Sequence, residues 1–217
     1  MEREKKMKIL FYGDSITDAN RDRNADNWLG SYGFGYPSFV AGELLSKNPE
    51  QYEIINRGIS GNKIVDLYAR IKMDVWNLRP DVLSVLVGVN DVWHELYHGT
   101  GVDLKRFDKI YRMMIEETLQ ILPNLKIVLC EPFVLEGTAT NEKYEDFLQV
   151  KMYAKAVKHI AEDYNLSFLP LQEMLEDAAK RTAPEYVLAD GVHPAIGGAR
   201  LIADEWLKIF EKEINNK

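Results

Sequence analysis

Residues 8–18 read KILFYGDSITD, an almost wholly apolar run that stops at a glycine followed by an aspartate and a serine. A short apolar run without polar alternation is typical of a strand that is buried on both faces of a parallel sheet. Comparable runs recur along the chain, and we predict five strands, at Lys8–Tyr12, Glu53–Asn56, Val82–Val87, Lys126–Cys130 and Ser167–Leu169.

Amphipathic segments separate these runs. Apolar side chains recur at helical spacing within residues 104–122, 147–161 and 196–210. Because parallel neighbours need crossover helices, the alternation predicts an α/β protein, a three-layer α/β/α sandwich around a central parallel sheet of about five strands. No internal repeat or linker rich in proline, glycine and serine divides the 217 residues, so we expect a single domain over residues 1–217.

The composition excludes several classes of protein. With 27 basic and 34 acidic side chains, the formal net charge is −7, which argues against a nucleic-acid partner. A single cysteine rules out an intrachain disulfide and suits a reducing compartment. No apolar stretch approaches the roughly 20 residues that span a bilayer, and the N-terminal run is shorter than the about 7–15 apolar residues of a secretory signal. We therefore expect a soluble, cytoplasmic protein without a membrane partner.

Polar residues gather after the predicted strands, and ligands of such sheets bind beyond the carboxyl ends of the strands. Ser15 follows the first strand on a turn that Gly13 permits, and Asp190 and His193 stand in the loop DGVHP. An aspartate three residues before a histidine can accept its Nδ1–H and leave the other ring nitrogen for a nucleophile. We predict that Ser15, His193 and Asp190 form a catalytic triad. Taken singly, Ser15 could be only a turn residue or helix cap, and DGVHP only an Asx-turn before a helix.

Acyl transfer also requires hydrogen-bond donors for the developing oxyanion. The backbone N–H groups of Ser15 and Gly58 and the side-chain amide of Asn90 are the predicted donors. In a purely structural interpretation, Gly58 would be a loop glycine and Asn90 a helix cap. The GxSxG elbow of the α/β-hydrolases is absent from the sequence, which disfavours that family.

The strings GDSITD, NRGISGN, GVNDVW and DGVHP occur in this order between residues 13 and 194. Together they resemble the four blocks of the GDSL, or SGNH, hydrolases, with GDSI where the family name has GDSL. The resemblance implies a flavodoxin-like SGNH hydrolase fold. It assigns the Ser, Gly, Asn and His of the blocks, and the triad acid, to Ser15, Gly58, Asn90, His193 and Asp190.

Within the family, the fuller strings look most like those of bacterial intracellular acetylxylan esterases, which deacetylate carbohydrates. The resemblance therefore implies a serine esterase whose partner is a small-molecule ester, foremost an acetylated xylo-oligosaccharide, and which needs no metal or organic cofactor. Related esterases are often homo-oligomers, although no stripe of this sequence predicts a symmetry. Lysophospholipase, thioesterase and arylesterase activities stay open as alternatives, and the sequence does not determine the sugar, the acetyl position or the acyl-chain limit.

Several residues near the predicted triad are candidates for contact with the substrate. An aromatic loop, WLGSYGFGYP at residues 28–37, follows the nucleophile turn, and its rings could either stack on a sugar or pack over the next helix. The GDSITD and GVNDVW blocks contribute further side chains. The candidate substrate contacts are Asp14, Trp28, Tyr32, Trp93 and His94.

Residues 94–98 read HELYH, which matches the HExxH pattern of zinc proteases. The third histidine of the longer signature would fall on Leu104, and residues 99–101, Gly-Thr-Gly, would end the helix that the pair requires. Glu116 or Glu117 could serve as a distant third ligand, so a zinc metalloprotease remains a rival interpretation. A non-catalytic carbohydrate-binding domain is a second rival. We predict no metal site.

Overall fold

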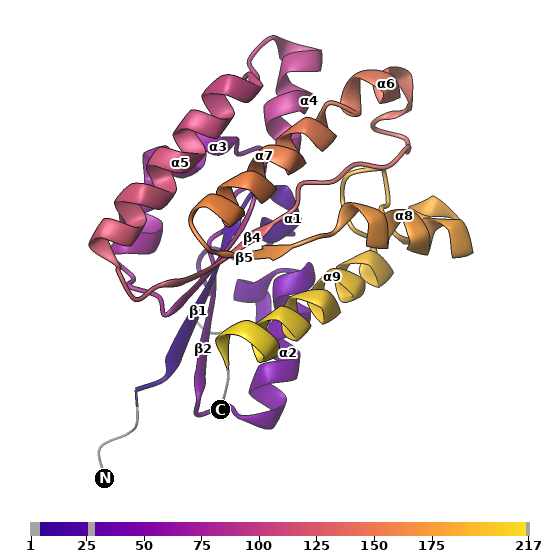
Figure 1. Ribbon diagram of the computed structural model, residues 1–217. Helices are drawn as coiled ribbons and strands as arrows, with labels where there is room; N and C mark the ends of the chain where they lie inside the picture. The colour runs from indigo at the N-terminus through magenta and orange to yellow at the C-terminus, as the bar shows by residue number, and fades with distance from the viewer. Residues whose placement is uncertain (1–4, 26–28, 216–217) are drawn as a thin grey trace.

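A parallel sheet forms the centre of the molecule (Figure 1). Its strands lie in the order β2-β1-β3-β4-β5. The computed structural model describes residues 5–25 and 29–215, and five strands lie within these ranges. Each predicted strand is confirmed to within one residue at either end. The strands are β1 (Met7–Gly13), β2 (Tyr52–Asn56), β3 (Val82–Leu86), β4 (Lys126–Cys130) and β5 (Ser167–Leu169).

Helices cover both faces of the sheet, which confirms the predicted three-layer α/β/α sandwich. Figure 1 shows α3, α5 and α7 on one face and α2 and α9 on the other, and contacts join α3 to α5, α5 to α7 and α2 to α9. The α-helices are α1 (Ser15–Asp18), α2 (Tyr36–Lys47), α3 (Ile64–Ile71), α4 (Val89–His98), α5 (Leu104–Ile121), α6 (Tyr144–Phe147), α7 (Val150–Asp163), α8 (Gln172–Arg181) and α9 (Ile196–Ile209).

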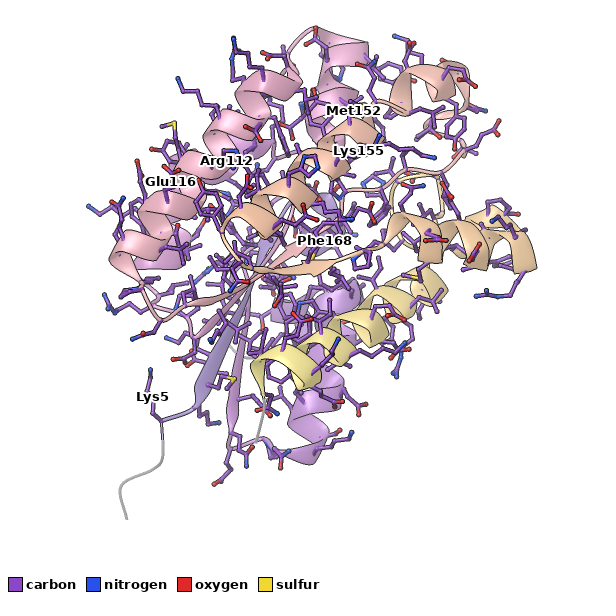
Figure 2. All side chains as sticks on the ribbon, viewed as in Figure 1. Lys5, Arg112, Glu116, Met152, Lys155 and Phe168 are labelled. Carbon is purple, nitrogen blue, oxygen red and sulfur yellow. The ribbon has the colours of Figure 1, made fainter. Side chains whose placement is uncertain are left out.

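Burial on both faces explains why the strands are apolar throughout. Residues 9–12 of β1 are fully buried, and all five side chains of β3 are buried as well. The helices on the two faces turn an apolar stripe to the sheet and leave mostly polar side chains outside. On α7, for example, Lys155 is exposed, and Arg112 of α5 pairs with Asp163 at the end of α7 at 2.7 Å (Figure 2). Such alternation is what a crossover helix between parallel strands requires.

The predicted helical run 147–161 is wrong in one respect, because the structure divides it. Phe147 ends α6, and α7 begins at Val150. Near the break, the N–H of Gln149 donates to the carbonyl of Asp146 at 3.2 Å, and the N–H of Met152 donates to the carbonyl of Gln149 at 2.8 Å. These bonds span three residues rather than four, so the chain tightens and changes direction between the two helices. Phe147 nevertheless remains fully buried.

Candidate active site

Ser15 lies where β1 ends and α1 begins, at the carboxyl end of a central strand. A Cβ atom on Gly13 would lie 2.4 Å from the carbonyl oxygen of Leu86, so a larger residue could not make this turn. Asp14 caps α1, because its Oδ1 accepts the N–H of Ile16 at 3.0 Å. These contacts hold Ser15 half-buried at the start of a helix, where its own N–H has no intrahelical acceptor.

Three side chains from distant parts of the chain form one hydrogen-bonded series. The Oγ of Ser15 is 2.9 Å from Nε2 of His193, a residue 178 positions further along the chain. The Nδ1 of His193 is 2.7 Å from Oδ2 of Asp190. The structure thus brings together the three residues predicted as a triad, with the imidazole between hydroxyl and carboxylate.

The loop that carries His193 is held rigidly against the rest of the molecule. Leu188 and Pro194 form an antiparallel bridge, and the N–H of Leu135 donates to the carbonyl of Gly191 at 2.8 Å. Gly191 has a φ of +98°, and a Cβ atom there would lie 2.6 Å from the Leu135 carbonyl oxygen. The loop therefore needs glycine at this position, and the imidazole rests on a fixed backbone.

The carboxylate and the imidazole shift each other's pKa in opposite directions. Burial by itself raises the pKa of Asp190, but hydrogen bonds from the His193 ring and from two backbone N–H groups outweigh it and lower the value to about 2. The hydrogen bond to Asp190 raises the pKa of His193 above its ordinary value, while partial burial acts in the opposite direction. A basic imidazole beside an ionised carboxylate can accept a proton from a serine hydroxyl.

Asn90 lies in the first turn of α4 and is buried. Its Nδ2 donates to the carbonyl of Asn62 at 3.1 Å, so the side chain of Asn90 packs against the loop after β2. A side-chain amide has two N–H groups. One is used in this contact, and the other is available to a further acceptor.

Gly58, the second predicted backbone donor, already donates its N–H to another group of the protein. Its N–H donates to Oδ1 of Asn56 at 2.8 Å within a buried environment. A Cβ atom on Gly58 would lie 2.2 Å from the backbone nitrogen of Asp18, so this glycine lets the loop pack directly on α1. Both features give Gly58 a structural role, and its N–H already has an acceptor.

Gly61, in the same NRGISGN block, has the free N–H that Gly58 lacks. Its backbone has a φ of +81°, and no acceptor for its N–H lies within the described part of the chain. Gly61 stands between Ser60, which lines the cavity described below, and Asn62, which binds the Asn90 amide. The sequence offers two glycines in one block and no signal that separates them, because which N–H is free depends on how the loop packs.

A cavity of about 400 Å³ lies beside Ser15 and His193. Its walls come from the start of α1, the residues directly after α1, the aromatic loop, the loop after β2 and the loop that carries His193. A volume of this size suits a small ligand. The lining residues are Ser15, Ile16, Ala19, Asn20, Phe34, Ser60, His193 and Pro194.

The two candidate contacts in α4 have different neighbours. The ring of Trp93 is 6.0 Å from that of His193, at an interplanar angle of 52°, and 5.7 Å from that of Phe147. Trp93 therefore supports the imidazole from the side. His94 lies beside the loop after β2, since a Cβ atom on Gly61 would be 4.0 Å from its Cε1.

The candidates nearer the N-terminus are placed less favourably for contact with a ligand. Asp14 is fully buried beneath Ser15. Tyr32 is half-buried, and its carbonyl accepts an N–H from the Asn56 amide at 2.9 Å. Trp28 lies outside the described residues. Phe34, from the same aromatic loop, is 77% exposed and lines the cavity.

Two buried carboxyl groups lie under the site. Burial raises the pKa of Asp14 to about 7, and its Oδ2 has no hydrogen-bond partner in the described part of the chain. Burial likewise raises the pKa of Asp91 well above its ordinary value, while its Oδ1 accepts the N–H of Ile64 at 3.1 Å. Both carboxyl groups serve chiefly to cap and join neighbouring segments.

The HELYH segment does not form a helix long enough for a zinc-protease site. It occupies the end of α4, which stops at His98 because Gly99 takes a left-handed conformation with a φ of +63°. The rings of His94 and His98 lie 5.9 Å apart. Within residues 5–25 and 29–215, no group of three or more His, Cys, Asp or Glu side chains is arranged to hold a metal ion.

The helices have the lengths and compositions of helices that pack on a sheet. Of those in the described ranges, none combines the length and the apolar character needed to cross a bilayer.

Comparison with known proteins identifies the family of the chain. The GDSL-like lipase/acylhydrolase family matches residues 11–201. An acetylxylan esterase of Geobacillus stearothermophilus is 34% identical over 207 residues, which cover 93% of this chain and 92% of that protein. A solved structure from Parabacteroides merdae, provisionally assigned as a GDSL-like lipase, has a TM-score of 0.89 at 41% identity and covers 94% of this chain and 95% of its own.

Solved structures of Axe2, an acetylxylan esterase from Geobacillus stearothermophilus, are similar to this chain as well. One has a TM-score of 0.83 at 34% identity and covers 96% of this chain and 95% of its own. Others are mutants described as catalytic, in which a serine, an aspartate or a histidine is replaced by alanine. The chain therefore belongs to the GDSL-like lipase/acylhydrolase family of carboxylic ester hydrolases.

Proposed function

We propose that this protein is a serine esterase that removes acetyl groups from carbohydrate esters, with acetylated xylo-oligosaccharides as the preferred substrates. The observation that carries this proposal is the hydrogen-bonded series from the Ser15 hydroxyl through His193 to Asp190, at the wall of a cavity of about 400 Å³. The carbohydrate substrate is inferred from the similarity to Axe2, whose catalytic mutants concern the same three residue types.

In the first half of the proposed reaction, the Oγ of Ser15 attacks the carbonyl carbon of the acetyl group. His193 takes the hydroxyl proton on Nε2, which lies 2.9 Å from Oγ. Asp190 keeps Nδ1 protonated and stabilises the imidazolium that forms. When the tetrahedral intermediate collapses, the bond to the sugar oxygen breaks, and His193 returns the proton to that oxygen. The acetyl group remains on Ser15.

In the second half, a water molecule takes the place of the sugar. His193 removes a proton from the water, and the resulting hydroxide attacks the acetyl-enzyme. Collapse of the second intermediate breaks the bond to Oγ and releases acetic acid, which loses its proton to the solvent, and the proton on His193 returns to Ser15. Each step uses groups of this chain, the ester and water.

The negative charge that forms on the carbonyl oxygen needs fixed donors. The backbone N–H of Ser15, the free N–H of the Asn90 amide and the N–H of Gly61 are the donors that we assign. Gly61 is a better candidate than Gly58, because the N–H of Gly58 already donates to the buried Asn56 amide oxygen. Because these donors are already in position before the reaction, little free energy is spent on reorganising them as the charge develops.

Labelling with a fluorophosphonate tests the nucleophile directly. The reagent should add to the Ser15 hydroxyl of the wild-type protein, as detected by intact mass and peptide mapping. Ser15→Ala should abolish the adduct, whereas Ser60→Ala should retain it, because Ser60 lines the same cavity without contacting the imidazole. A wild-type protein that is not labelled at Ser15 contradicts the proposal.

A panel of esters then separates the substrate classes. We expect kcat/KM to be higher for acetylated xylo-oligosaccharides than for lysophospholipids, acyl thioesters and long-chain aryl esters. A higher kcat/KM for lysophospholipids, thioesters or aryl esters would contradict the proposed substrate class but would leave the serine mechanism in place. Activity that is lost to a chelator but insensitive to Ser15→Ala would instead favour the metalloprotease alternative.

A further inference from the structure

The segment directly after α1, which forms part of the cavity wall, has an unusual backbone. Ala19 and Asn20 have φ values of +41° and +58°. Positive φ is uncommon for residues other than glycine, and two such residues in succession are more so. Both residues line the cavity that contains the Ser15 hydroxyl.

Neighbouring contacts hold this segment in place. Asp18 is buried, with only 4% of the residue exposed, and its carboxylate accepts the N–H of Ser60 at 2.9 Å and the N–H of Arg21 at 3.2 Å. The N–H of Ala19 donates to the carbonyl of Ser15 at 2.9 Å. The fold therefore presents Asn20 in a fixed, exposed position, and the Asn20 amide makes no hydrogen bond within the described part of the chain.

Phe34 reaches the same cavity from the aromatic loop, and its backbone is also fixed. Its N–H donates to the carbonyl of Ala19 at 2.8 Å. The flanking glycines pack on the end of α1, since a Cβ atom on Gly33 would lie 2.4 Å from the Asp18 carbonyl oxygen and one on Gly35 would lie 2.8 Å from Cβ of Ala19. The backbone thus packs closely against α1, while Phe34 as a residue remains 77% exposed.

We propose that Asn20 and Phe34 form the subsite for the sugar part of the ester, the alcohol that leaves when Ser15 is acylated. This assignment rests on the proposed esterase function. A pyranose ring offers C–H groups on its faces and hydroxyl groups around its edge. The face of Phe34 can cover the C–H groups, and the amide of Asn20 can both donate to and accept from hydroxyl groups. An unbranched alkyl alcohol has no ring face to cover and no further hydroxyl group to bind, so the subsite distinguishes sugar acetates from alkyl acetates.

Comparing two substrates for each variant tests the subsite. Acetylated xylobiose and ethyl acetate carry the same acyl group, and kcat and KM are measured for both with wild type, Phe34→Ala and Asn20→Gly. Because glycine adopts positive φ without strain, Asn20→Gly removes the amide and preserves the backbone. We expect the loss of kcat/KM to be roughly 5- to 20-fold larger for acetylated xylobiose than for ethyl acetate in Phe34→Ala, and roughly 3- to 10-fold larger in Asn20→Gly. The difference should lie in KM.

Tyr186→Ala is the matched control, because Tyr186 is an aromatic residue that is 67% exposed and does not line the cavity. This variant should keep the wild-type ratio between the two substrates, and Phe34→Trp should restore the ratio lost in Phe34→Ala. If Phe34→Ala and Asn20→Gly lower kcat/KM equally for both substrates, or leave the ratio of the two kcat/KM values unchanged, the subsite is overturned. In that case, labelling of Ser15 by the fluorophosphonate still supports the esterase proposal. Absence of that labelling overturns the esterase proposal and the subsite with it.

Discussion

Two regions of the molecule bring histidines close to the same cavity, the loop around His193 and the helix α4. His193 lies between a serine hydroxyl and an ionised carboxylate, and the hydrogen bond to Asp190 raises its pKa. For His94 of α4, burial and the nearby positive charges of Lys63 and His98 lower the pKa. The comparison shows that the charged partners of a histidine, and not only its position near a site, decide the direction in which its pKa shifts.

The largest effect should separate the two histidines. His193→Ala should lower kcat toward a simple acetate ester by at least ~10³-fold, as should Ser15→Ala, because the proton acceptor and the nucleophile act as one unit. His94→Ala should cost less than about tenfold, since His94 contacts neither Ser15 nor Asp190 in the structure. Steady-state kinetics, with circular dichroism as a check on folding, measures the difference. Equal losses of kcat in His193→Ala and His94→Ala would contradict the difference between the two histidines.

The second prediction concerns what α4 contributes. In the proposed mechanism, α4 contributes the Asn90 amide and not an imidazole. Asn90→Ala should therefore lower kcat roughly 10²- to 10³-fold and change KM little, because the hydrogen bond from the amide to the ester carbonyl oxygen forms only as charge develops on that oxygen. His98→Ala, which alters an exposed residue of the same helix, serves as the control. An Asn90→Ala variant that changes KM alone would contradict the oxyanion assignment.

A third prediction compares the glycines that shape the two regions. Gly99 ends α4 with a φ of +63° and has no atom within 4 Å of an added Cβ, whereas Gly191 has a φ of +98° and two oxygens at 2.6 Å. Gly99→Ala should cost about 1 kcal/mol of unfolding free energy, the strain of a left-handed alanine, and lower Tm by about 2–4 °C. Gly191→Ala should cost at least twice as much, because the carbonyl of Leu135 must also move. Calorimetry measures both, and equal shifts would show that the His193 loop is less rigid than its contacts indicate.

The smallest effect is a shift along the pH axis. In the proposed mechanism the base form of His193 is the active one, so kcat/KM should rise with pH, with a midpoint above the ordinary histidine value of 6.5. Asp190→Asn removes the partner that raises the pKa and should move the midpoint to lower pH. In an NMR titration, His94 should titrate below 6.5. If His94 titrates above His193, the electrostatic difference between the two regions is refuted.

The same pKa shifts link folding stability to pH. The raised pKa of His193 contributes stability that is fully present below the unfolded-state pKa and is lost as pH rises through the folded-state value. The lowered pKa of Asp190 contributes stability that is present above the unfolded-state pKa and is lost as pH falls toward about 2. The unfolding free energy can be measured by denaturation from pH 2 to 9 in wild type and in Asp190→Asn. In the variant, both the loss of stability at acidic pH and the loss as His193 deprotonates should be smaller.

Most of the fold could be predicted from local sequence patterns. Strands buried on both faces are apolar throughout, and the five runs from Lys8 onward were recognisable for that reason. The division between α6 and α7 was not, because the run from Phe147 to Ala161 keeps an apolar stripe across the break. Hydrogen bonds that span three residues around Gln149 create the break, and they depend on the surrounding structure rather than on periodicity.

The sequence by itself determined which residue types stand after the strands and in the loop DGVHP beyond α8, and therefore the candidates Ser15, Asn90, Asp190 and His193. Parallel topology brings the carboxyl ends of strands to one edge, so Ser15 and Asn90 could be expected to meet, and a triad requires the Asp-His pair beside the serine. Tertiary packing decided the rest. It occupied the N–H of Gly58 and left that of Gly61 free, since the two glycines differ only in what surrounds them. Burial of Asp14 and exposure of Phe34 have the same origin, because solvent access is a property of the assembled layers and not of any single segment.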